Sequence, residues 1–175
     1  VTNNSGVVGV KGASLVRVGD DSVAKYPGLT ISGGTFTQDN FIVIKVDRGT
    51  FYLKEDGTLN SKNSYAVENW KFAEIKGGTV NGTVAAWTYS GGHNSDLTIS
   101  GGTVNGALDT RSYDPSTNEL TSIDDATKAT IAVTGGTFSS AVDKSLCADG
   151  YIPTQNADGT YGVKVGQYVA EVGTT

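Results

Sequence analysis

The sequence predicts an all-β protein folded as a parallel β-helix, a solenoid in which each coil of the chain stacks on the one before it. Three observations support this prediction. Glycine accounts for 24 of the 175 residues, only 18% of the residues are charged, and one octapeptide pattern recurs along the chain. Glycine and the β-branched threonine both disfavour helices, and self-similarity at a period of 20 to 50 residues is typical of solenoids.

Each copy of the octapeptide reads as a strand, a Gly-Gly corner and the start of a second strand. Clear copies are residues 29–36, 73–80, 97–104 and 131–138, and a weaker copy is residues 44–51. The first and third residues of a copy share one face of a strand, and the eighth returns to the interior after the corner. Three stacked apolar columns are therefore expected. They are Leu29, Ile44, Ala73, Leu97 and Ile131; Ile31, Val46, Ile75, Ile99 and Val133; and Phe36, Phe51, Val80, Val104 and Phe138.

The spacing of the copies averages about 25 residues, which predicts about seven coils for the whole chain. A threonine follows each corner, and these residues are expected to stack as a ladder: Thr35, Thr50, Thr79, Thr103 and Thr137. The segments between copies are polar and unequal in length. The longest, residues 107–128, is expected to project from one side of the solenoid as an insertion, where a binding face would lie.

The C-terminal part predicts a cap over the last coil. Ser140 and Asp143 resemble a weak capping box for a helix of two turns, in which Cys147 would pack inward. Asn156-Ala-Asp-Gly159 between two apolar stretches predicts a β-hairpin. The expected organisation is coils with polar insertions over residues 1–138, the helix and hairpin over 139–166, and the start of a linker or next module over 167–175.

Charge and composition disfavour several classes of protein. The net charge of −5 and the isoelectric point of about 4.7 disfavour nucleic-acid binding, which needs a basic face. Cys147 is the single cysteine, so an internal disulfide is excluded. No run of 18 apolar residues is present, so membrane insertion is not expected. The chain begins at Val1 without methionine, and we expect it to be a fragment of a longer protein.

The run from Gly135 to Val163, with Gly-Gly-Thr-Phe-Ser at its start and Asn-Ala-Asp-Gly-Thr-Tyr-Gly-Val at its end, resembles a unit that ends repeats in large surface proteins of Gram-positive gut bacteria. Those proteins resemble right-handed β-helices of the pectin-lyase-like kind. Residues 168–175 are similar to the start of their next unit. The resemblance implies a tandem module of an extracellular, cell-surface or cell-wall protein. Its implied partners are neighbouring modules of the same chain and a host or microbial glycan or protein.

Aromatic residues are the candidate ligand-binding side chains, because sugars and peptides stack on exposed rings with polar edges. Trp87, Tyr89 and Tyr113 are the chosen candidates, with Tyr65 and Trp70 in the same interpretation. The alternative is that these rings cover the flank of the solenoid. His93 is the only histidine and is expected on a loop surface, so neither a His-His metal pair nor a Ser-His-Asp triad is expected.

Polysaccharide lyases that share the fold bind calcium through clustered Asp residues beside a basic side chain. The corresponding residues here would be Asp109, Arg111, Asp114, Asp124 and Asp125. A calcium ion could also be held by Asp109, Asp114, Asn118 and Glu119, since hard cations prefer such oxygens. The alternative is that these are solvated turn residues.

The preferred hypothesis is a non-enzymatic adhesin or stalk module without a required cofactor. A calcium-dependent polysaccharide-active enzyme is the second hypothesis.

Overall fold

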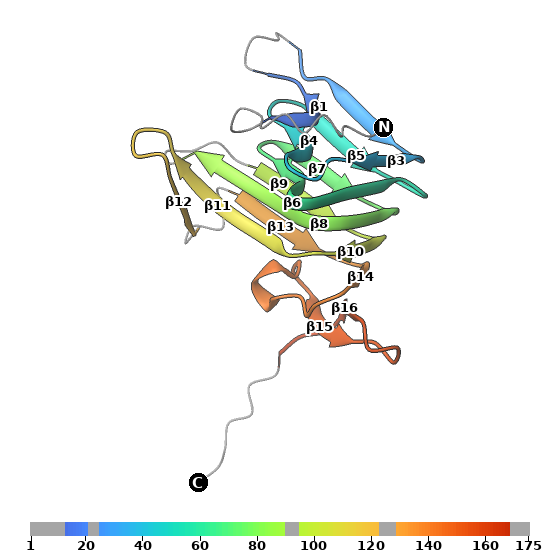
Figure 1. Cartoon of the computed structure of the whole chain (residues 1–175). Coiled ribbons are helices and arrows are strands. Elements are labelled where there is room, and N and C mark those ends of the chain that lie inside the picture. The colour runs from blue at the N-terminus through green and yellow to red at the C-terminus, as the bar shows by residue number, and fades with distance from the viewer. Residues whose placement is uncertain (1–12, 21–24, 90–94, 123–128, 169–175) are drawn as a thin grey trace.

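The computed structural model describes residues 13–20, 25–89, 95–122 and 129–168. Over these residues the chain forms a β-solenoid of about four turns (Figure 1). The strands are β1 (Ser14–Val18), β2 (Gly28–Ile31), β3 (Thr35–Thr37), β4 (Ile42–Val46), β5 (Thr50–Leu53), β6 (Thr58–Asn69), β7 (Phe72–Ile75), β8 (Thr79–Tyr89), β9 (Ser95–Ile99), β10 (Thr103–Asn105), β11 (Leu108–Asp114), β12 (Glu119–Ser122), β13 (Ala129–Val133), β14 (Thr137–Phe138), β15 (Tyr151–Gln155) and β16 (Tyr161–Val165).

Two sheets run along the solenoid. Sheet B has the order β13-β9-β7-β5-β2, and all its neighbouring strands are parallel. Sheet A contains β1, β4, β6, β8, β10, β14, β16 and β15 in that order, with β3, β11 and β12 joined at its side. Successive turns therefore pair strand on strand in parallel, as the sequence predicts for a β-helix.

The core follows the predicted stacking, with one error of register. The first column is Leu29, Phe51, Ala73, Leu97 and Ile131, and the second is Ile31, Leu53, Ile75, Ile99 and Val133. Ile44 and Val46 were assigned to these columns wrongly, because they belong to β4 in sheet A and align with Val67 and Asn69.

The same error displaced one member from each of two further columns. Leu59 takes the place expected for Phe51, and Thr58 takes the place expected for Thr50. The segment Arg48-Gly49-Thr50 imitates the corner pattern but joins sheet A to sheet B.

Glycine is required where consecutive corners stack. Gly102 has φ +79°, and a Cβ built there would lie 2.6 Å from the carbonyl oxygen of Gly77 in the turn below. Both the backbone angle and the close approach exclude a side chain. In the turn that lacks a Gly pair, Glu55 takes a positive φ of 50°.

The structure has about four turns, where seven were predicted from chain length. The part of each turn that lies in sheet A is long. Strand β6 runs beside both β3 and β4, and strand β8 runs beside both β10 and β11. Residues 107–128 also differ from the expected loop-like insertion. Their first part is β11, which continues sheet A in parallel with β8 and then folds back antiparallel into β12.

The C-terminal cap contains the predicted hairpin but not the predicted helix. Strands β15 and β16 pair antiparallel around Asn156–Gly159, and Tyr161 of β16 pairs with Phe138 of β14. The expected two-turn helix is a single 3-10 turn, Lys144–Leu146, capped by Asp143. Cys147 forms an isolated parallel β-bridge with Val133 at the edge of sheet B, and it packs partly against the core. In the described segments, no helix is both long and apolar enough to cross a bilayer.

Candidate functional site

The outer surface of sheet A carries two aligned columns of large side chains. Because Val16, Ile44, Val67 and Val84 point into the core, their neighbours point outward. The first outward column is Arg17, Lys45, Glu68, Ala85 and Asp109. In the second, Trp87 aligns with Arg111, and Asp47 and Trp70 come directly after the aligned pair Val46 and Asn69 at the ends of β4 and β6. Charged residues thus occupy the ends of both columns, Glu68 and Ala85 the middle of the first, and the two tryptophans the middle of the second.

Five aromatic rings pack together over the middle of this surface. Trp70 lies at the centre, with ring centroids 4.6 Å from Tyr89, 5.4 Å from Trp87 and 6.2 Å from Tyr113. Tyr65 meets Trp87 edge-on at 5.2 Å. The cluster covers Ala85 completely, although Ala85 is on the outward face of its strand. It is a small second core outside the solenoid.

Glu68 is buried beneath these rings and hydrogen-bonds one of them. It is 4% exposed, and its Oε1 accepts a hydrogen bond of 2.7 Å from Trp70 Nε1. Desolvation raises the pKa of Glu68 above its ordinary value, although the Trp70 hydrogen bond and nearby Lys45 act in the opposite direction. The carboxylate thereby fixes the orientation of the central ring.

The corner that carries Trp70 and Lys71 is held from inside by Asn69. This side chain is fully buried, and its Nδ2 donates to Ser95 Oγ and to the carbonyl oxygen of Asp96, each at 2.9 Å. Its Oδ1 accepts from the backbone N–H of Lys71 at 3.2 Å. A polar residue at this inward position therefore ties sheet A to the start of β9 and sets the direction of the two residues that follow.

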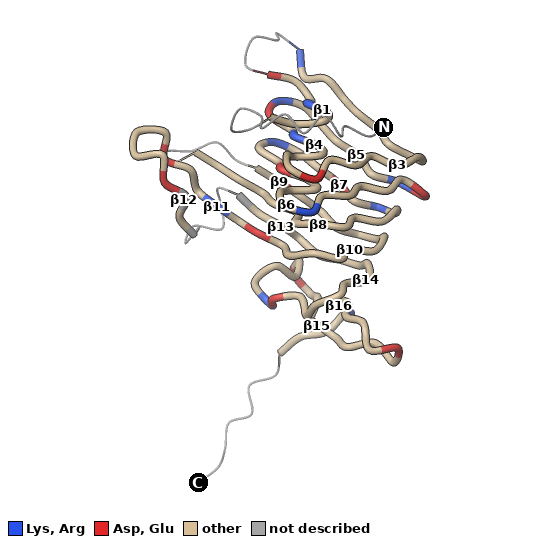
Figure 2. Tube along the Cα trace, viewed as in Figure 1, with Lys and Arg blue, Asp and Glu red and all other residues tan. Residues whose placement is uncertain are grey.

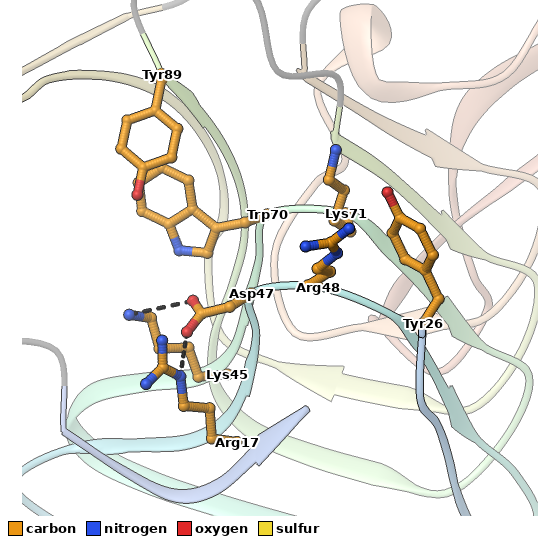
Figure 3. A pocket seen from close by; sticks show the side chains of 8 residues that line it. All are labelled: Arg17, Tyr26, Lys45, Asp47, Arg48, Trp70, Lys71 and Tyr89. Carbon is orange, nitrogen blue, oxygen red and sulfur yellow. Dashed lines mark hydrogen bonds and ion pairs between the residues drawn. The ribbon is translucent and has the colours of Figure 1, made fainter. Parts of the chain in front are cut away.

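A hollow of about 300 Å³ opens beside Trp70 and Tyr89 (Figure 3). We call it the aromatic-basic pocket. Its described lining contains three aromatic residues, four basic residues and one carboxylate: Tyr26, Trp70, Tyr89, Arg17, Lys45, Arg48, Lys71 and Asp47. Four of the chain's 13 lysines and arginines line this pocket, in a protein of net charge −5. Figure 2 shows Lys and Arg positions on the turns around β1 and β4. The pocket is locally basic on an acidic protein.

Asp47 organises one side of the pocket. Its Oδ1 lies 3.2 Å from Lys45 Nζ, and its Oδ2 accepts from Arg17 Nε. The Asp47 and Lys45 side chains are only 14% and 17% exposed, which protects the Lys45 pair from solvent screening better than an open surface would. This three-residue network forms a polar floor below the Trp70 ring in the view of Figure 3.

Arg48 and Tyr26 form another side. The Arg48 guanidinium lies 4.9 Å from the centroid of the Tyr26 ring, a cation–π geometry. Gly19, at φ +70°, lets the Arg48 carbonyl pass so closely that a Cβ at residue 19 would overlap it. The backbone at the end of β1 thus fixes the link between β4 and β5 from which Asp47 and Arg48 project.

The sequence-predicted aromatic residues do come together, but they have different exposures. Trp87 is 9% exposed and its Nε1 is buried without a hydrogen-bond partner among the described residues, so it supports the pocket from behind. Tyr89 is 37% exposed and lines the pocket. Tyr113 packs against Trp70 and Tyr89, and its hydroxyl donates to Asn118 Oδ1 at 2.9 Å.

The calcium candidates lie at two ends of one hairpin. Asp109, near the start of β11, pairs with Arg111 at 2.8 Å. Asp114 accepts from Ser116 N at 2.8 Å and Oγ at 2.6 Å, which lowers the Asp114 pKa, and it lies opposite Glu119 in the hairpin. Within the described ranges, no three His, Cys, Asp or Glu side chains are grouped to hold a metal. The other candidates, His93, Asp124 and Asp125, lie outside the described residues.

Sequence reasoning missed most of the basic side of the pocket. Arg17, Tyr26, Arg48 and Lys71 come from three different turns, and only their register brings them together. The available signal was the alignment of Arg17 with Lys45 on successive strands, which requires the correct spacing of the turns.

Fold and site together define the protein as a β-solenoid with an aromatic-basic pocket on the outside of one sheet. Comparison of the chain with protein-family models, with curated proteins and with solved structures gives no match.

Proposed function

We propose that this chain is a non-enzymatic carbohydrate-binding module and that the aromatic-basic pocket is its binding site. The observation that carries the proposal is the meeting of the Trp70 and Tyr89 rings with four basic side chains and Asp47 around one hollow. Ligand sites combine aromatic side chains with placed polar groups that fix the orientation of the ligand, and this lining supplies three aromatic and five charged side chains.

Each side of the pocket matches one part of a sugar. The C–H face of a pyranose ring is apolar and packs on an aromatic ring, for which the exposed rings of Tyr89 and Tyr26 are available, with the buried Trp70 behind Tyr89. Sugar hydroxyl groups both donate and accept hydrogen bonds. Asp47 can accept them, and the basic side chains can donate them. The packing of Trp70 on Trp87 and its bond to Glu68 hold Trp70 in place, and Tyr89 packs on this fixed ring, which reduces the entropy cost of ordering Tyr89 on binding.

We further propose that the module belongs to a tandem array in an extracellular protein of the bacterial cell surface, with the right-handed, pectin-lyase-like form of the β-helix. This part of the proposal is supported by the resemblance of residues 135–163 and 168–175 to repeat units of Gram-positive surface proteins. Its partners would be neighbouring modules of the same chain and a host or microbial glycan.

A glycan array tests the proposal directly. The wild-type chain should bind a defined subset of glycans, and Tyr89→Ala should lose most of that signal, because Tyr89 forms the exposed edge of the pocket. Tyr52→Ala is the matched control, since its ring packs on Phe72 on sheet B, away from the pocket. No glycan signal from the wild type, or equal signals from wild type and Tyr89→Ala, would leave a stalk as the better account.

Incubation with acidic polysaccharides separates the module from an enzyme. We expect no new chain ends and no unsaturated products, with or without added calcium. Turnover that disappears in Asp109→Asn or Arg111→Ala variants would instead favour a calcium-dependent polysaccharide-active enzyme.

A further inference from the structure

We infer that the ligand is a saccharide whose bound sugar ring carries one acidic group, a carboxylate or a sulfate ester, and that Lys71 binds this group. The inference rests on the proposed carbohydrate-binding function and specifies its ligand. It concerns the side of the pocket opposite the Trp70 and Tyr89 rings.

The charges around the pocket are unbalanced. Four basic side chains line it and only one described carboxylate, Asp47, does so. Asp47 is already bonded to Arg17 and Lys45. Lys71 is intermediate in exposure as a residue, and its ammonium has no carboxylate partner among the described residues. A partly desolvated cation gains more from an anionic ligand group than a fully solvated one, because the local dielectric constant is lower.

The positions of the side chains separate the two functions of the pocket. In Figure 3, Trp70 and Tyr89 lie together on one side of the hollow, and Arg48, Lys71 and Tyr26 lie together on the other. A sugar ring against Tyr89 would therefore direct a substituent across the hollow toward Lys71. Tyr26 lies against the Arg48 guanidinium and limits where that side chain can move.

The volume limits how much of a glycan can enter. A hollow of about 300 Å³ is at the small end of the range for ligand pockets. It accommodates one sugar ring with its acidic substituent more readily than several consecutive rings. The pocket is thus suited to a single charged sugar of a longer glycan.

A glycan array built from matched trios tests the inference, each trio carrying one core as the neutral, the sialylated and the sulfated form. The wild type should bind at least one charged form about tenfold more tightly than its neutral form, as a charge-assisted contact provides. Lys71→Gln should bring the ratio of charged-form to neutral-form affinity close to one. Lys76→Gln is the control, because Lys76 pairs with Glu74 at 3.1 Å outside the pocket.

The outcomes are distinct. Preference for the sialylated form assigns the acidic group as a carboxylate, and preference for the sulfated form assigns it as a sulfate. Equal binding of neutral and charged forms, or a preference that Lys71→Gln leaves intact, overturns the inference while the carbohydrate-binding function stands. Absence of binding to every trio overturns both. A single-stranded oligonucleotide that binds more tightly than every glycan also overturns both.

Discussion

Trp70 Nε1 donates a 2.7 Å hydrogen bond to Oε1 of the buried Glu68, two residues earlier in the chain. Both residues lie on the outer side of sheet A, where an aromatic cluster replaces solvent. The bond links the orientation of the ring at the pocket wall to the ionisation of a carboxylate beneath it.

The first prediction follows from this burial. Since desolvation raises the pKa of Glu68 above 4.5, the folded chain holds the Glu68 proton more tightly than the unfolded chain. The Glu68 contribution to the free energy of unfolding is therefore greatest below pH 4.5 and declines as the pH rises through the folded-state pKa. Glu68→Gln keeps an acceptor for Trp70 but does not titrate. Urea unfolding across a pH series should show the variant gaining stability relative to wild type as pH rises, whereas a constant difference would contradict this.

The buried Asn69 should be important for stability. Asn69→Ala removes bonds to Ser95 and Asp96 and leaves buried polar atoms unpaired. We expect a loss of about 2–3 kcal/mol in the free energy of unfolding, measured by chemical denaturation. Asn105→Ala is the control, since the exposed Asn105 donates a bond of 2.9 Å to Asn81 Oδ1, and its loss should cost under about 1 kcal/mol. Equal losses from the two variants would show that Asn69 has no special role.

The stacked corners give a third prediction. Gly102→Ala should destabilise the solenoid by more than about 2 kcal/mol, because the new Cβ would approach the Gly77 carbonyl at an unfavourable φ. Gly33→Ala should stay within about 1 kcal/mol of wild type, because a Cβ there meets nothing within 4 Å. Thermal and urea unfolding of the pair provide the comparison. A tolerated Gly102→Ala would mean that the turns stack less closely than the structure indicates.

Calcium should have no effect on this chain. Asp109 precedes Asp114 by five strand residues, a span of about 16 Å, and it is paired with Arg111. We expect no saturable heat in a calorimetric titration with calcium and no change in melting temperature on chelation. Saturable binding that Asp114→Asn abolishes would revive the calcium hypothesis.

The sequence was sufficient to predict the solenoid, the hairpin cap and most core positions. It succeeded because Gly-Gly-Thr corners recur at fixed offsets from apolar residues. It failed for the turn that uses Glu55-Asp56-Gly57 as its corner, because Glu55 adopts a positive φ without being glycine. The sequence prediction instead places a corner at Arg48-Gly49-Thr50, which resembles the Gly-Gly-Thr pattern but connects sheet A to sheet B.

The site could be predicted only in part, for a related reason. Aromatic side chains are few and large, so Trp70, Trp87 and Tyr89 could be chosen as candidates from their residue type alone. The basic residues lie far apart in the sequence and meet only because the turns stack. Stacked positions are about 22 residues apart in this part of the chain, as from Leu29 to Phe51 and from Phe51 to Ala73. An error of register in one turn was enough to hide the approach of Arg17 to Lys45.

One measurement tests the central claim most directly, namely that the aromatic-basic pocket binds carbohydrate. Tyr26 and Tyr168 are both 62% exposed, and each ring lies 4.9 Å from a cation, Arg48 and Lys144 respectively. Only Tyr26 lines the pocket. In titrations with the best glycan from the array, Tyr26→Ala should weaken binding by about tenfold, and Tyr168→Ala should leave it unchanged. Equal affinities for the two variants would contradict the assignment of the pocket.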